Sequence, residues 1–147
     1  MSDEAESGEV LHQVAETDWF LQSLVKMVNG FTIEFGITLQ VSGMLVSGNL
    51  VSGEKYFEGF AADFSGPFNA EPEVAESIRK NFSSYGEIYR VDNDEATRPL
   101  PQFIHLKNAR FFNTADKPIP GNTGVWWRGR ISEVGGFSLG SLRAEEA

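Results

Sequence analysis

The sequence contains no cysteine and only two histidines. The absence of cysteine excludes a disulfide framework and any thiolate metal site, and it fits a reducing compartment. His12 and His105 are isolated, so a zinc centre or a histidine-based catalytic centre has little to start from. No apolar run approaches the roughly 20 residues of a membrane span, and the acidic beginning lacks the layout of a signal peptide. We therefore expect a cytoplasmic protein with no membrane segment, no metal and no cofactor.

Complete catalytic motifs are also missing. The chain has no Gly-x-Ser-x-Gly elbow, and its three Val-Ser-Gly triplets lack the spacing and the lysine of a P-loop. The carboxylates of Asp92, Asp94 and Glu95 resemble a loose calcium site but lack the glycine and distal glutamate of an EF-hand. His105 lies in a strand pattern, and we interpret it as a structural histidine with one hydrogen bond. We do not expect an enzyme.

Charge is unevenly distributed along the chain. The net charge is −9, and residues 1–97 carry 5 basic and 17 acidic side chains, whereas residues 98–147 carry 7 basic and 4 acidic ones. An acidic surface repels phosphate backbones, so general nucleic-acid binding is not expected. The basic carboxy-terminal part is the place where a local positive face would form.

The length of 147 residues and the hydrophobic content of 41% suit one domain. Residues 1–16 contain five carboxylates and no lysine or arginine, so we interpret them as an acidic disordered tail. The folded domain is expected at 17–142, and 143–147 is a short tail.

The most regular pattern is a pair of adjoining strands over Phe31 to Ser52. Apolar residues occupy every second position from Phe31 to Val41, which is typical of a half-buried strand. Ser42 and Gly43 supply a two-residue turn that sets Val41 opposite Met44. A single apolar face therefore continues through the turn.

Helices are expected on both sides of this hairpin. Thr17 or Asp18 caps a helix over Trp19 to Val28, which Gly30 ends. The segment at about 54–85 is a helical insertion, and its second helix starts near Pro72, a favoured first-turn residue. An exposed acidic loop follows at about 86–101.

The remaining chain is rich in strand patterns. Ile104 and Leu106 alternate, and a change of parity near Lys107 and Asn108 predicts a bulge. A further strand begins near Val125, and Gly135 and Gly136 are expected to turn the chain into a last strand over Phe137 to Leu142.

The strand that begins near Val125 carries Trp126, Arg128 and Arg130 at alternate positions, so these three side chains share one face. We include Lys107 in the same candidate surface. Arginine and tryptophan are enriched where partners bury surface, and arginine stacks on aromatic rings or forks onto carboxylates. This face is our candidate binding site, for a partner or for the protein's own acidic tail. In the alternative interpretation Trp126 covers a small core and the arginines are merely solvated.

Two segments resemble the gas vesicle accessory protein U family. The first is GFTIEFGITLQVSGMLVSGNLVSGEKYF at Gly30 to Phe57, and the second combines FIHLKNARFF at Phe103 to Phe112 with WWRGRISEVGGFSLG at Trp126 to Gly140. The resemblance implies a non-enzymatic role in the assembly or organisation of the gas compartments that give cells buoyancy.

The order of elements favours an α+β fold, with an amino-terminal helix and an inserted helical segment on a small bent antiparallel β-sheet or an Sm/SH3-like barrel. We expect an accessory protein that binds gas vesicle shell or other accessory proteins and supports assembly or clustering through self-association as a homo-oligomer. The alternative is an Sm-like barrel that binds RNA or a small ligand. A hydrolase ranks third, because no convergent polar site is visible.

Overall fold

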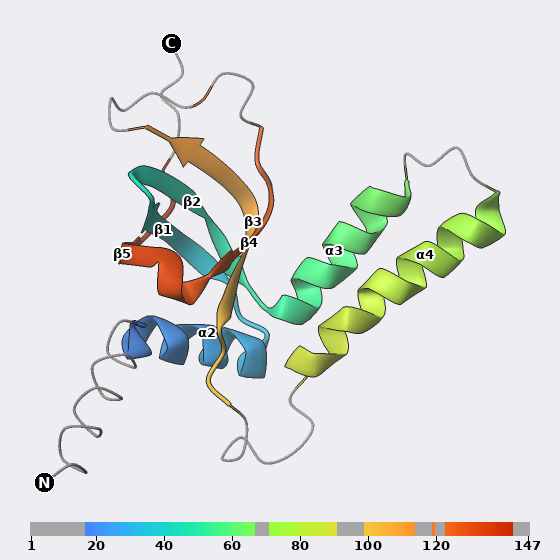
Figure 1. Cartoon of the computed structure of the whole chain (residues 1–147), viewed down its shortest axis with the longest axis horizontal. Coiled ribbons are helices and arrows are strands. Elements are labelled where there is room, and N and C mark those ends of the chain that lie inside the picture. The colour runs from blue at the N-terminus through green and yellow to red at the C-terminus, as the bar shows by residue number, and fades with distance from the viewer. Residues whose placement is uncertain (1–16, 67–70, 91–98, 114–118, 120–122, 143–147) are drawn as a thin grey trace, which may run out of the picture.

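The computed structural model describes residues 17–66, 71–90, 99–113, 119 and 123–142. In these residues a five-stranded antiparallel sheet packs on one helix, and a hairpin of two further helices projects from it as an arm (Figure 1). The α+β class, with its amino-terminal helix and inserted helical segment, is confirmed. The predicted tails at 1–16 and 143–147 and the carboxylates of Asp92, Asp94 and Glu95 lie outside the described residues.

Helix α2, Trp19–Phe31, starts where the sequence predicts. The Asp18 side chain accepts hydrogen bonds from the amides of Phe20 and Leu21 and so caps the helix. The helix continues three residues beyond its predicted end and closes at Thr32, which has a φ of 53° and donates its amide to the Val28 carbonyl. The prediction of a strand from Phe31 is therefore wrong. Phe31 is 69% exposed, so its place in the alternating pattern did not correspond to a place in the core.

The central hairpin is confirmed in position and register. Strands β1, Phe35–Val41, and β2, Met44–Val51, pair antiparallel with Val41 opposite Met44. Ser42 and Gly43 have φ values of 50° and 80°, as a type I′ turn requires. The turn chemistry and the period of two agree here, so a local pattern was enough to determine the register.

Strand β3, Phe103–Phe112, contains the predicted bulge. Its pairing with both neighbours shifts register near Asn108, which has a φ of 55°. Strand β4, Val125–Arg130, is followed by the 3₁₀ turn η2, Ile131–Glu133, and by β5, Val134–Leu139.

The predicted turn at Gly135 and Gly136 is wrong. Both glycines lie inside β5, where Gly136 pairs with Gln40 of β1. The chain turns earlier because Ile131 is buried and donates its amide to the Gln102 carbonyl, at 2.9 Å. The last strand accordingly ends at Leu139 and does not reach Leu142.

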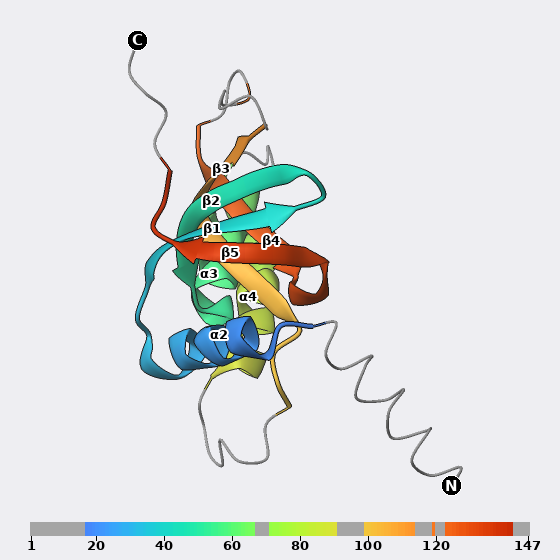
Figure 2. The same ribbon diagram turned by 90° about the vertical axis from the view of Figure 1, so that its left-hand side faces the viewer.

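The strand order is β4-β3-β2-β1-β5, so β4 and β5 are the two edges. The sheet is strongly curled, as Figures 1 and 2 show, but no ladder joins β4 to β5 in the described part of the chain. Of the two architectures expected, the bent open sheet is the one observed, and a closed Sm/SH3-like barrel is not.

The core lies between α2 and the concave face of the sheet. One stripe of α2 enters it, together with the inward side chains of the strands and of η2. These fully buried residues are Leu21, Val25, Val28, Ile37, Leu39, Leu50, Ile104, Leu106, Ala109 and Ile131. Burial of such aliphatic side chains is the main stabilising contribution to a domain of this size.

The arm consists of α3, Gly53–Ser65, and α4, Pro72–Ser84, followed by the 3₁₀ helix η1, Tyr85–Tyr89. Ser52 caps α3 and Pro72 occupies the first turn of α4, as predicted. The loop predicted from Gly86 onward is wrong for residues 86–89, since η1 packs back on α3 and buries Gly86.

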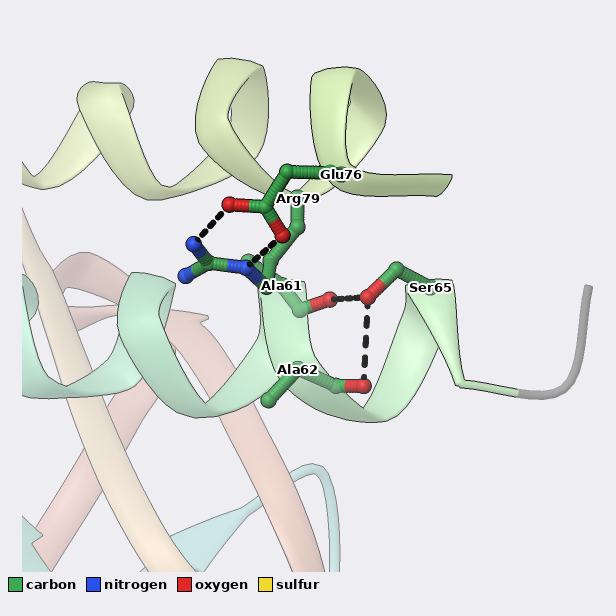
Figure 3. Close-up of polar contacts among 5 residues, drawn as sticks. All are labelled: Ala61, Ala62, Ser65, Glu76 and Arg79. Carbon is green, nitrogen blue, oxygen red and sulfur yellow. Dashed lines mark hydrogen bonds and ion pairs between the residues drawn. The ribbon is translucent and has the colours of Figure 1, made fainter. Parts of the chain in front are cut away.

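Aromatic rings join the two helices of the arm. Phe82 of α4 makes edge-to-face contacts with Phe60 and Phe64 of α3, with centroids 5.8 and 5.0 Å apart. The polar contacts drawn in Figure 3 lie within each helix: Ser65 bonds back to the Ala61 carbonyl, and Arg79 pairs with Glu76. Ring packing is thus a principal link between α3 and α4.

Candidate functional site

The four residues singled out in the sequence lie on two neighbouring strands. Trp126, Arg128 and Arg130 occupy alternate positions of β4, as predicted, and Trp126 and Arg128 contact residues of α3. Lys107 lies at the bulge of β3 and lines a small cavity of about 130 Å³ that Trp126 also lines. The structure therefore places all four near the joint between arm and sheet, where they have different surroundings.

Trp126 packs against the protein's own arm. Its indole lies so close to Gly59 of α3 that an added Cβ there would be 2.0 Å from Trp126 Cζ2. The ring also meets Tyr56 edge to face, with centroids 6.2 Å apart. Trp126 is thus a structural anchor of the joint, in line with the alternative interpretation of this residue.

His105 forms the centre of the joint and is fully buried in β3. Three aromatic rings of the arm surround it: Tyr56 at 4.8 Å, Tyr89 at 5.2 Å and Phe57 at 5.9 Å between centroids. Its Nε2 accepts a hydrogen bond from Arg128 Nε at 3.2 Å, whereas Nδ1 has no hydrogen-bond partner among the described residues.

Burial, together with the smaller effect of the positive charge of Arg128, lowers the pKa of His105 to about 3. The imidazole is therefore neutral at pH 7. A neutral ring is also what the geometry requires, because Nε2 can accept from Arg128 only when it carries no proton. His105 is a structural histidine with one hydrogen bond, as the sequence indicated.

Arg128 is held in one position while remaining exposed. Its guanidinium carbon lies 3.6 Å from the centroid of Phe103 and 5.7 Å from that of Phe57. With Nε bound to His105, the two terminal nitrogens are available to a ligand. Arg130 lies two residues further along β4, directly opposite Phe103, and is also exposed.

The two arginines have no carboxylate partner among the described residues, although other cations of this protein do. Lys55 pairs with Glu34, Arg79 with Glu76, and Arg90 with Glu54. An arginine that is stacked and already ordered loses little side-chain entropy on binding a carboxylate. Arg128 is ordered in this way, and Arg130 adds a second exposed positive charge on the same strand.

An apolar cavity of about 340 Å³ adjoins Arg128, because Phe103, on which Arg128 stacks, is one of its lining residues. The end of α2, η1 and the segment before β3 form its walls. The lining residues are Lys26, Asn29, Gly30, Ile88, Tyr89, Pro99, Leu100, Pro101, Gln102 and Phe103. The site thus combines two cations with a neighbouring apolar recess.

The sequence identified the arginines but not the aromatic residues that position them. From the sequence, Tyr56 and Phe57 are only residues of the inserted helical segment, Tyr89 falls in the predicted loop at about 86–101, and Phe103 is only a strand residue. Their role depends on how the arm packs on the sheet, for which the local pattern carries no signal.

In the part of the chain that the structure describes, no helix is long and apolar enough to span a membrane.

Comparison with known proteins places the chain in a family. The family described as gas vesicle protein GvpU-like matches residues 18–142, which include every helix and strand of the structure. No curated protein matches the chain. No solved structure matches it either. Because the match extends over most of the sequence, the chain belongs to the GvpU-like family of gas vesicle proteins.

Proposed function

We propose that this gas vesicle accessory protein binds an acidic segment of a shell protein or of another accessory protein through Arg128 and Arg130, in the cytoplasm at the vesicle. The observation that carries the proposal is the ordered state of Arg128 beside a second exposed arginine. Arg128 is stacked on Phe103 and anchored on His105, and neither arginine has a carboxylate partner in the described residues. Trp126 and Lys107 support the site from the joint and from the bulge.

We further propose that the protein associates with itself and so links vesicles into clusters. Both outer strands of the sheet, β4 and β5, leave one side unpaired in the described residues. Exposed apolar side chains lie beside the β5 edge: Leu139 and Trp19 are each 72% exposed, and Phe20 packs on Phe137 of that strand. Uncovered edges with apolar neighbours favour pairing between chains.

Flotation tests the binding function. The purified protein is mixed with intact gas vesicles and centrifuged, and the floating layer is assayed for the protein. The affinity of the double variant Arg128→Glu with Arg130→Glu for the vesicles should fall by at least about tenfold, because repulsion replaces two charge-assisted contacts.

Two further variants make the result specific. Arg130→Glu alone keeps the Arg128 contact to His105 and should still weaken flotation, whereas Lys80→Glu on the exposed face of α4 changes the net charge equally and should not. Equal flotation of all variants would contradict the role of the arginine pair.

A further inference from the structure

The beginning of α2 lies next to the Arg130 end of β4. Gln22, one turn into the helix, donates its side-chain amide to the Pro101 carbonyl at 3.0 Å. The next residue, Gln102, accepts the amide of Ile131, and Phe103 then pairs with Arg130. The point at which the chain enters α2, at Asp18, therefore lies close to Arg130 in the fold.

No strand of the described residues pairs with the outer side of β4. The Ile131 amide points to β3, so alternation along an antiparallel strand directs the peptide groups of Arg128 and Arg130 away from β3. The cationic side chains of Arg128 and Arg130 and the outward backbone groups of these residues thus lie at the same edge. An extended segment with carboxylates at alternate positions would match both features.

The amino-terminal sequence has this composition. Residues 1–16 carry five carboxylates and no lysine or arginine, and Glu4 and Glu6 are two residues apart, as Arg128 and Arg130 are. Both pairs are spaced roughly 6.5–7 Å when the chain is extended. The stretch from Glu6 to Asp18 can span up to roughly 40 Å, far more than the distance needed.

We infer that residues 1–16 bind in cis to the β4 edge, with Glu4 and Glu6 on Arg128 and Arg130. Short flexible links give an effective concentration in about the millimolar range, so a weak contact is populated. Where the proposed function holds, this segment competes with the acidic partner for the same arginines. The amino-terminal segment then restrains partner binding.

Paramagnetic relaxation in the full-length protein tests the contact. The chain has no cysteine, so Ser7→Cys can carry a single nitroxide label. At low salt the amides of Gly129 and Arg130 should be broadened, whereas those of Ala75 and Glu76 on α4 should not. The broadening should disappear at about 0.5 M salt, where screening acts within a few ångströms. Unbroadened β4 amides at low salt would overturn the inference.

Variants and isotope mixing complete the test. Arg130→Gln combined with Arg128→Lys should remove the broadening, and Lys80→Gln should leave it intact. The second experiment mixes nitroxide-labelled protein at natural isotope abundance with ¹⁵N-enriched protein that carries no nitroxide. Broadening of the β4 amides in this mixture would show that the amino-terminal segment of a second copy binds, which would overturn the cis arrangement.

The consequence for the partner is measured separately by flotation. Replacing Glu4, Glu6 and Glu9 with glutamine should raise vesicle affinity about twofold or more, since the competitor is weakened. Relaxation evidence for the tail contact with no flotation of any variant would reject the proposed function alone. Flotation that depends on Arg130 without any tail contact would reject this inference alone.

Discussion

His105 shows how one side chain connects the arm to the sheet. It is buried among Tyr56, Phe57 and Tyr89 of the arm, and it positions Arg128 on β4. A protonated imidazole in this place would lie beside the Arg128 charge without water to stabilise it. The residue therefore makes the joint sensitive to acid.

The sign of this effect follows from the two pKa values. In the folded protein the pKa of His105 is about 3, against an ordinary value of 6.5, so between these limits the unfolded chain binds more protons. The stabilising contribution is complete above about pH 6.5 and decreases as the pH falls towards 3. The charged and titratable groups that face the ring are Arg128, Tyr56 and Tyr89, and burial raises the pKa of Tyr56 above its ordinary value.

Urea denaturation of the wild type and of His105→Gln at pH 7 and pH 5 measures the contribution. The free energy of unfolding of the wild type should fall by about 2 kcal/mol more than that of the variant between these pH values. Other titrating groups, His12 included, are common to both proteins and cancel in the comparison. An identical pH dependence of the two proteins would contradict a buried neutral His105.

At the scale of elements, close contact at one glycine holds the arm to the sheet, and a second such contact lies within the arm. Gly59 admits the Trp126 indole, and Gly53 faces the ring of Tyr89, where an added Cβ would lie 2.3 Å from Cδ2. The sequence shows Gly59 only as a weakness of the helix, since glycine lowers helix stability by roughly 1 kcal/mol relative to alanine. The tertiary structure explains why a glycine is present here, because a side chain at position 59 would prevent α3 from packing on β4.

Gly59→Ala should therefore destabilise the protein by about 1–3 kcal/mol despite the better helix propensity. Gly66→Ala is the matched control, because Gly66 has a φ of −61° and an added Cβ would meet its nearest atom at 3.4 Å. The control should be neutral or stabilising by up to about 1 kcal/mol. Thermal or urea denaturation measures both, and a stabilising Gly59→Ala would contradict the contact with Trp126.

At the scale of the whole molecule, charge and apolar surface are separated. The arm and the amino-terminal part are acidic, β4 carries the exposed arginines, and the opposite edge strand, β5, has no charged residue. Charged residues normally protect edge strands from pairing with other chains. Of the two edges, β5 is therefore the better surface for a second copy.

Leu139→Lys should weaken self-association about tenfold or more, because an exposed apolar contact is lost and a charge is placed on the edge. Sedimentation velocity over a range of protein concentrations measures this. Val74→Lys on α4, where the valine is 50% exposed, is the control and should not change association. Unchanged association of Leu139→Lys would exclude the β5 edge.

Local sequence determined the elements whose partners lie nearby in the chain. The Ser42-Gly43 turn and the period of two defined the β1–β2 register, and side-chain caps and prolines defined the starts of α2, α3 and α4. These interactions act over a few residues, so a local pattern contains them. The family resemblance of the strand segments also came from the sequence alone.

Tertiary structure decided everything that depends on distant residues. It extended α2 through Phe31, placed the last turn at Ile131, and assigned Trp126 to the arm rather than to a partner. It also brought His105 and Phe103 to Arg128, which holds the side chain of an exposed strand arginine in one position. Such arrangements follow from the burial of side chains far apart in sequence, because the free energy of that burial is defined only once the sheet and the arm have packed together.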